Sequence, residues 1–365
     1  MHIVNSMFIR SISETQGGNK MSIRVGIIGC GSIVKHRHAP EYKANPSVSD
    51  LVFYDRNIER AEAMAKQFEG SVAHSVEDLL LDTTIEAISD CSSNEYHHIF
   101  STEALLHGKH VLCEKPIALS VEHANQMIEA QKKSGKKLMV AHNQRFTKAH
   151  MRAKQIIESN ELGNVLTFKT SFGHKGPEHW GTNKTNSTWF FKKNRSGFGV
   201  LGDLGIHKID LLHFLLDDEI EQVCAFQGAL DKKDEYDNPI EVCDNIVSSL
   251  KTKRGRLGTA SFSWTYYGEE DNSTIIYFER GMMKIYDNPT YQIQIIKNNG
   301  EKIHYEVEPI QTNDNQSNSG VIDAFIQCIC LDETPPVTGE QALLSLKVVL
   351  SMLEAAENGR VVHVS

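Results

Sequence analysis

The chain has 365 residues, of which 40% are hydrophobic and 23% are charged, and this length predicts roughly two domains of ~100–200 residues each. The formal net charge of −9 argues against nucleic acid or an anionic membrane as a partner, because both require a basic surface. Seven cysteines without a C-x-x-C pair indicate reduced thiols in a cytoplasmic protein and predict neither a disulfide framework nor a metal site.

The N-terminal residues 1–21 are expected to form a disordered extension. Their longest apolar run is too short for a secretory signal, and they contain no A-x-A cleavage site. A mitochondrial-type leader is the alternative, supported only by two positive residues. No stretch of the chain approaches ~20 consecutive apolar residues, so we expect no transmembrane helix.

A short apolar strand and a glycine turn follow in IRVGIIGCGS, and a helical pattern comes next. This order is typical of a dinucleotide-binding unit, in which a pyrophosphate lies at the helix N-terminus. Gly29 permits the tight turn, Gly31 lets the backbone approach the anion, and Ser32 and Ile33 complete the turn. Val34 stands where a third glycine or an alanine is usual, so helix and strand are expected to pack slightly farther apart.

The second strand, DLVFYDRN, ends at Asp55. A carboxylate at this strand end can accept hydrogen bonds from the adenine ribose hydroxyls, which favours NAD as the cofactor. Arg56 comes next and can stack on adenine or pair with a 2′-phosphate, so NADP is the alternative. A solvated turn carrying two charges is the simplest competing interpretation.

Strand and helix patterns continue to alternate through KHVLCEKPIAL, which predicts a doubly wound parallel sheet over residues 22–143. Ligands of such sheets gather at the carboxyl ends of the strands. Asp90 occupies a strand position and requires a partner if it is buried, but the sequence does not identify one. Six residues at these strand ends are expected to contact the cofactor, namely Ser92, Ser93, Asn94, His97, Glu114 and Lys115.

A second domain is predicted over residues 144–365. A helix precedes several strand patterns in which apolar and polar residues alternate, as in an antiparallel sheet with two different faces. The polar segment at residues 173–197 is long enough to be functional. Its alternative is a lid that packs on itself through its tryptophans.

The segment SGFGVLGDLGIHKIDLLHFLL is mostly apolar but contains Asp203, His207 and Asp210. Ionisable groups seldom stay buried without a partner or a task. At ~100° per residue the three lie on one side of a helix, which predicts a polar stripe facing a cavity. The competing interpretations are a helix cap for Asp203, a core histidine for His207 and a supporting role for Asp210.

Four segments resemble the Gfo/Idh/MocA oxidoreductase family: the glycine turn with Asp55, NEYHHIFSTEALLHGKHVLCEKP, HNQRF and GVLGDLGIHKID. The resemblance covers nearly the whole chain after residue 21. It implies an α/β protein, with an N-terminal Rossmann domain and a C-terminal α+β domain whose large open sheet is mostly antiparallel. The family usually has threonine-proline where this chain has Ser92-Ser93, so the turn lacks the rigidity of proline.

The resemblance also implies NAD(P)-linked oxidation of a hydroxyl on a sugar, sugar derivative or cyclitol, by a homodimer or homotetramer formed through the second sheet. It assigns the catalytic lysine to Lys115 and the aspartate–histidine pair to Asp203 and His207. A histidine suits a base working near neutral pH, an ammonium stabilises a developing alkoxide, and an aspartate can orient the histidine. The residues expected to contact the substrate are Lys115, Arg145, His174, Trp189, Asp203 and His207.

Two other functions are compatible with the sequence. One is an enzyme that holds NAD tightly and uses it transiently, as in epimerisation or glycoside cleavage through a keto intermediate. The other is a nucleotide-sensing regulator without chemistry, which the combination of Lys115, Asp203 and His207 disfavours.

Overall fold

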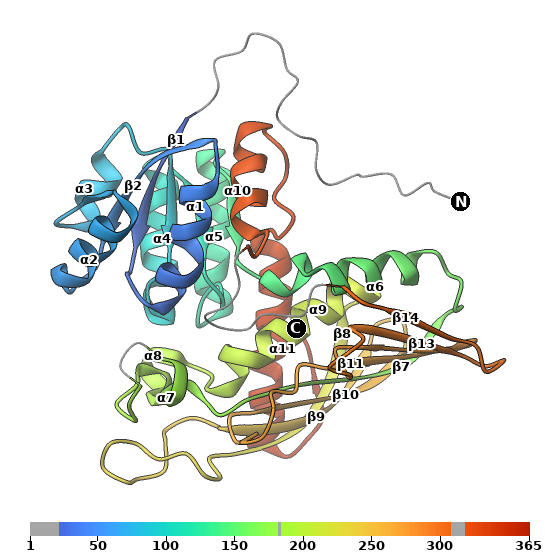
Figure 1. Ribbon diagram of the computed structural model, residues 1–365. Helices are drawn as coiled ribbons and strands as arrows, with labels where there is room; N and C mark the ends of the chain where they lie inside the picture. The colour runs from blue at the N-terminus through green and yellow to red at the C-terminus, as the bar shows by residue number, and fades with distance from the viewer. Residues whose placement is uncertain (1–21, 182–183, 308–317) are drawn as a thin grey trace.

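The computed structural model describes residues 22–181, 184–307 and 318–365, and the expected extension at residues 1–21 lies outside them. Two sheets with their helices dominate the structure (Figure 1). The prediction of a parallel α/β half followed by a mostly antiparallel half is confirmed.

The first sheet has six parallel strands in the order β3-β2-β1-β4-β5-β6. The strands are β1 (Ile23–Ile28), β2 (Val48–Tyr54), β3 (Ser71–Val72), β4 (Ala87–Asp90), β5 (His110–Cys113) and β6 (Leu138–Val140). β1, β4, β5 and β6 are short and almost wholly buried, as strands covered by helices on both faces must be.

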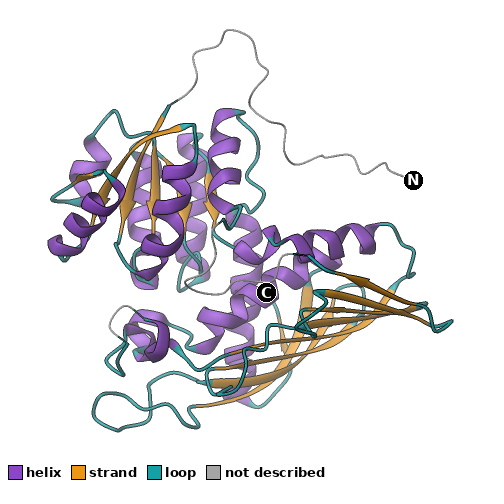
Figure 2. Ribbon diagram, viewed as in Figure 1, coloured by secondary structure: helices purple, strands orange, loops and turns teal. Residues whose placement is uncertain are grey.

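Helices cover both faces of this sheet (Figure 2). They are the π turn η2 (Val34–His38), α1 (Ala39–Ala44), α2 (Ile58–Phe68), α3 (Val76–Leu81), the 3₁₀ turn η3 (Asn94–Tyr96), α4 (His97–Leu106) and α5 (Val121–Ser134). Side chains of Asn57, Ser75 and Ser120 cap α2, α3 and α5 by accepting a backbone N–H of the first turn. The helical segment after the glycine turn begins with the π turn η2, in which Val34 is fully buried.

The second sheet has nine strands in the order β14-β13-β12-β11-β7-β10-β9-β8-β15, and every pair except β10–β7 is antiparallel. The strands are β7 (Val165–Gly173), β8 (Ile220–Gly228), β9 (Asn245–Thr252), β10 (Leu257–Ser263), β11 (Thr274–Phe278), β12 (Gly281–Ile285), β13 (Ile293–Lys297), β14 (Lys302–Tyr305) and β15 (Val362–His363). Burial alternates along β9, so the sheet has one buried and one exposed face, as the alternating pattern predicts.

Helices lie against the buried face of this sheet and leave the other face open (Figure 2). The helical segments of the second half are η4 (Asn143–Phe146), α6 (Lys148–Glu158), α7 (Pro177–Trp180), η5 (Trp189–Phe191), α8 (Lys193–Ser196), the π turn η6 (Leu201–Gly205), α9 (Ile206–Leu216), α10 (Val321–Cys330) and α11 (Gly339–Asn358). In the described part of the chain, no helix combines the length and the apolar character needed to cross a membrane.

The last two helices return to the first half of the molecule. α10 packs on α1, and just before it Ser319 donates through its backbone N–H and its hydroxyl to the buried Glu41 carboxylate, both at 2.8 Å. α11 contacts α5 and β6 of the first half and also α9 and β8 of the second. The contacts of α10 and α11 with the first half therefore join the two sheets, in addition to the passage of the chain from one half to the other at residues 141–147.

Candidate active site

The carboxyl ends of the parallel strands open into a cleft of about 630 Å³. A Cβ on Gly29 (φ +89°) would lie 2.5 Å from the Cys91 carbonyl oxygen, so only glycine fits there. A Cβ on Gly31 would meet no atom within 4 Å, which leaves open space above the turn. The cleft is lined by every residue that the sequence predicts for the cofactor: Gly29, Gly31, Ser32, Ile33, Asp55, Arg56, Ser92, Ser93, Asn94, His97, Glu114 and Lys115.

Asp55 links the glycine turn to the end of β2. Its Oδ2 accepts the backbone N–H of Cys30 at 2.8 Å, and its Oδ1 accepts that of Asn57, also at 2.8 Å. Arg56 and Arg60 line the same cleft. This corner therefore offers a carboxylate for ribose hydroxyls and two cations that can pair with a phosphate.

Asp90 is fully buried, and its partners are hydroxyls. Ser92 Oγ donates to Oδ1 at 2.7 Å, and Ser101 Oγ donates to Oδ2 at 2.8 Å. Burial nevertheless raises the pKa of Asp90. Ser92, which stands where the family usually has threonine, thus uses its hydroxyl to bind the Asp90 carboxylate. The ring nitrogens of His97 lie 2.7 Å from the Pro116 carbonyl and 3.1 Å from the Ser92 carbonyl, which fixes the same turn.

A second cavity, of about 160 Å³, adjoins the cleft, and Lys115, Asp203 and His207 all line it. Lys115 follows β5, whereas Asp203 lies in η6 and His207 in α9. The Lys115 ammonium donates to the Asp203 carbonyl at 2.9 Å and lies 3.3 Å from its carboxylate Oδ1. An amine of the nucleotide half and an imidazole of the sheet half therefore meet at one cavity. The shared lining of cavity and cleft consists of Ile33, Glu114, Lys115, Trp180 and Asp203.

The Asp203 carboxylate has a second donor that the sequence does not reveal. The indole N–H of Trp264, a fully buried residue just after β10, donates to Oδ2 at 3.0 Å. The His174 Nε2 lies 4.0 Å from the same oxygen. Because His174 Nδ1 accepts the Gly176 backbone N–H at 3.0 Å, the neutral ring carries its proton on Nε2, which faces Asp203.

His207 is a half-buried residue of α9 that lines the cavity. Burial lowers the pKa of His207 well below its ordinary value, and the charge of Lys115 acts in the same direction. Its Nδ1 is buried without a hydrogen-bond partner among the described residues. The ring contacts those of His142 and Phe172, with centroids 6.3 and 6.2 Å away.

Each half of the chain matches a known protein family profile. Residues 23–142 match the profile of an oxidoreductase family with an NAD-binding Rossmann fold, and residues 150–284 match the C-terminal domain of Gfo/Idh/MocA proteins. The chain belongs to the Gfo/Idh/MocA family.

Among relatives in this family, glucose-6-phosphate 3-dehydrogenase of Bacillus subtilis is 31% identical over 234 residues, covering 63% of this chain and 65% of the relative. D-glucoside 3-dehydrogenase of Escherichia coli is 30% identical over 196 residues, covering 53% and 54%. The matches thus span between half and two thirds of these relatives. The structure of levoglucosan dehydrogenase with NADH and L-sorbose superposes with a TM-score of 0.83 at 22% identity, covering 94% of this chain and 99% of that one.

Asp210 does not join Asp203 and His207 at the cavity of this Gfo/Idh/MocA protein. Its carboxylate is held by Arg145, with Nε to Oδ2 at 2.7 Å and Nη2 to Oδ1 at 2.6 Å. Burial alone would raise the pKa of Asp210, but His142 and Arg145 lower it overall. The predicted stripe of three residues is not formed: His207 and Asp210 both lie in the regular helix α9, but the Asp210 carboxylate pairs with Arg145 in the interior instead of facing the cavity.

Arg145 was expected to reach the substrate, and the structure places it elsewhere. Besides Asp210 it binds the Gln341 side chain of α11 at 3.0 Å, and it lines neither the cavity nor the cleft. Its neighbour Gln144 does line the cavity. Of the other predicted substrate residues, His174 lines the cavity, whereas Trp189 lines the cleft.

His38 lines the cavity, although no sequence pattern singles it out. Its Nε2 lies 2.8 Å from Glu114 Oε1 and its Nδ1 lies 2.8 Å from Ser89 Oγ, so it links η2 to the ends of β4 and β5. Burial raises the pKa of Glu114, but the hydrogen bond and charge of His38 outweigh it, and the net pKa is lowered. The carboxylate also accepts the Lys115 backbone N–H at 3.1 Å, which helps to fix the lysine.

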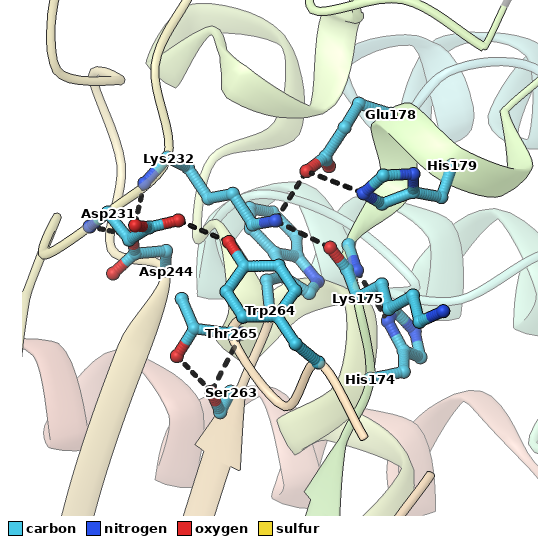
Figure 3. A network of polar contacts seen from close by, with 12 residues as sticks. His174, Lys175, Glu178, His179, Asp231, Lys232, Asp244, Ser263, Trp264 and Thr265 are labelled. Atoms are coloured by element: carbon cyan, nitrogen blue, oxygen red, sulfur yellow. Dashed lines mark hydrogen bonds and ion pairs between the residues drawn. The ribbon is translucent and has the colours of Figure 1, made fainter. Parts of the chain in front are cut away.

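The loop that carries His174 is anchored by a buried ion pair (Figure 3). The Lys232 ammonium donates to the Glu178 carboxylate and to the Lys175 carbonyl, so Glu178 faces Lys232. Asp244 holds the lysine segment by accepting the backbone N–H groups of residues 230, 231 and 232, each at 2.8 Å. This network fixes α7 and with it Trp180, which lines both the cavity and the cleft.

Proposed function

We propose that this protein is an NAD(P)-dependent oxidoreductase that transfers a hydride between nicotinamide and a hydroxyl-bearing carbon of a sugar, sugar derivative or cyclitol. The observation that carries the proposal is the meeting of Lys115 and His207 at one cavity beside the nucleotide cleft. Its family membership and the sugar-dehydrogenase names of its relatives support the substrate class.

The cleft residues fit a dinucleotide. The open space above Gly31 can take a pyrophosphate close to backbone N–H groups, and Asp55 can accept ribose hydroxyls. Arg56 and Arg60 would pair with a 2′-phosphate, so NADP is the alternative to NAD. When bound, the nicotinamide ring supplies the hydride acceptor at its C4 carbon.

The roles of the polar cavity residues follow from their charges. We assign the proton acceptor to His207, because its ring is neutral and can take the hydroxyl proton as the hydride leaves. The Lys115 ammonium would stabilise the negative charge that develops on the same oxygen. Asp203 would position Lys115, since its carbonyl and carboxylate contact the ammonium and Trp264 holds the carboxylate.

This assignment changes the role inferred from sequence for Asp203. Its carboxylate contacts Lys115, Trp264 and His174 rather than His207. The aspartate therefore orients the ammonium and not the base. His174, with its proton on Nε2, is placed to donate to a substrate hydroxyl at the same cavity.

The direct test is to mix the protein with NAD or NADP and a panel of hexoses, sugar phosphates, glucosides and inositols. A lasting rise in absorbance at 340 nm with one of them supports net dehydrogenation. Product formed without accumulated NADH would support transient use of the cofactor. No conversion of any panel member, by absorbance or product analysis, by protein that binds NADH would overturn the proposed activity.

We also propose that the protein assembles as a homodimer or homotetramer through the open face of the second sheet, and that it works in the cytoplasm. Phe226 of β8 and Val247 of β9 lie opposite each other on that face and are 73% and 52% exposed. Leu257 of β10 is 55% exposed. Exposed apolar residues on a continuous sheet favour a protein partner. All seven cysteines are free thiols, which suits a reducing compartment.

A further inference from the structure

A segment of the second half forms part of the nucleotide cleft. Residues Lys184–Ser196, here called the strap, follow the loop of α7 and contain η5 and α8. Lys184, Trp189, Phe190 and Arg195 of the strap line the cleft together with the glycine turn and Asp55. The cleft is therefore not built by the Rossmann half alone.

The strap is tied to the Rossmann half at its C-terminal end. Arg195 Nε donates to Glu95 Oε1 at 2.8 Å, and Arg195 Nη2 donates to Ser93 Oγ at 3.3 Å. Asn94 Nδ2 in turn donates to the Ser196 carbonyl at 3.0 Å. These three bonds all reach the short turn η3 and its N-cap, which itself borders the cleft.

The strap is equally well fixed to its own half. Phe191 is 3% exposed, and its ring centroid lies 5.9 Å from that of Trp264. The Lys193 backbone N–H donates to the Glu241 carboxylate at 2.8 Å. Just beyond the strap, a Cβ on Gly197 (φ +80°) would lie 2.6 Å from a Leu119 methyl, so the chain passes the Rossmann half at closest approach. The strap is thus a built element between the two halves.

The chemistry of the strap suits a dinucleotide. Trp189 and Phe190 are stacked with centroids 3.9 Å apart and an interplanar angle of 27°, and they offer an aromatic surface to a planar ring. Lys184 and Arg195 add positive charge to a cleft whose other lysine and arginine side chains, Arg56, Arg60 and Lys115, come from the Rossmann half. A dinucleotide presents both planar bases and a diphosphate, and the strap supplies a partner for each.

We propose that the strap is the second half of the dinucleotide site and that the Arg195–Glu95 ion pair sets how long NAD(H) stays bound. This inference rests on the proposed cofactor. Because Arg195 and Ser196 are bonded to η3 while Phe191 and Lys193 are held by the second half, we expect the cofactor to leave only after the contacts to η3 have broken. Arg195 acts here through its bonds to Glu95 and Ser93 as well as by its place in the cleft wall.

The test measures release of NADH without any sugar present. Enzyme loaded with NADH is mixed with excess NAD in a stopped-flow instrument, and the loss of NADH fluorescence gives the dissociation rate constant. Arg195→Ala and Glu95→Gln should each raise it about fivefold to tenfold, since each removes the ion pair. Arg360→Ala is the control, because it breaks an arginine–glutamate pair with Glu354 that is more exposed and lies outside the cleft, and it should leave the constant unchanged.

Melting temperatures measured without NADH establish that each variant is folded, and Glu95→Gln decides the question if Arg195→Ala is not. Dissociation within twofold of the unsubstituted protein in the folded variants would overturn the proposal, and so would an equal rise in Arg360→Ala. An enzyme that releases NADH as predicted but converts no sugar would refute the proposed function and leave the strap assignment standing.

Discussion

Replacing Lys115 with methionine keeps the length of the side chain and removes its ammonium. Two effects follow from the contacts at 2.9 and 3.3 Å to Asp203. Loss of the charge beside the reacting oxygen should lower kcat by about 10²- to 10³-fold. The Asp203 carboxylate, 7% exposed, would keep only the Trp264 N–H, so the free energy of unfolding should fall by about 1–3 kcal/mol.

The assay combines steady-state rates at 340 nm, using a substrate found in the panel, with urea denaturation. Lys137→Met is the matched control, because its side chain is also 16% exposed and also pairs with an aspartate, Asp332. It should leave kcat unchanged. The double variant Lys115→Met/Asp203→Asn removes the unpaired buried carboxylate, and it should recover most of the lost stability while kcat stays low.

The reasoning fails if Lys115→Met retains kcat within threefold of the unsubstituted protein, because the ammonium would then not act on the reacting oxygen. It fails equally if the double variant regains kcat together with stability. In that case Lys115 would serve only to neutralise Asp203.

Four further predictions address the base, the cofactor, the assembly and the fold. Since burial and Lys115 lower the pKa of His207, the acid limb of kcat/KM should lie below pH 6.5, and His207→Asn should abolish it; a limb that persists in the variant assigns the base elsewhere. Asp55→Ala should weaken NAD more than NADP in isothermal titration, and equal loss would show that the carboxylate does not read the ribose. Val247→Asp should give monomers by light scattering with an unchanged circular dichroism spectrum, whereas oligomers of native size would place the interface on another surface. Burial lowers the pKa of His213 to about 4, so the stability gained from its neutral ring is complete above pH 6.5 and is lost as the pH falls toward 4. Between pH 7 and 4.5, the free energy of unfolding of His213→Gln, measured by urea denaturation, should therefore fall less than that of the unsubstituted protein, by up to ~3 kcal/mol, and parallel curves would contradict the burial argument.

The sequence predicts the nucleotide half well because its signals are local. The turn at Gly29 and Gly31 and the acid at the end of β2 lie within one strand–helix–strand unit, where each residue type follows from backbone geometry. The alternating burial of β9 is equally local. The convergence of Lys115 and His207 was implied by family resemblance, since no short-range pattern places residues 92 positions apart at one cavity.

The partners of the site could not be read from the sequence, because they depend on packing between distant elements. Arg145 was expected at the ligand, but a bidentate pair with Asp210 holds it in the interior. Trp264 lies in a predicted strand, and only the folded structure shows that its indole N–H donates a hydrogen bond to the Asp203 carboxylate. Likewise no sequence pattern indicates that Lys232 pairs with Glu178 and so anchors the loop of His174.

The 20-residue helix α11 has a mechanical consequence. Because it rests against both sheets along its length, a hinge rotation of one half against the other would have to bend this helix or strip it from its neighbours. We therefore expect helix α11 to oppose wide opening and closing of the two halves. In that case we expect ligands to exchange through small local displacements at the rim of the cleft, with little change in the spacing between Lys115 and His207.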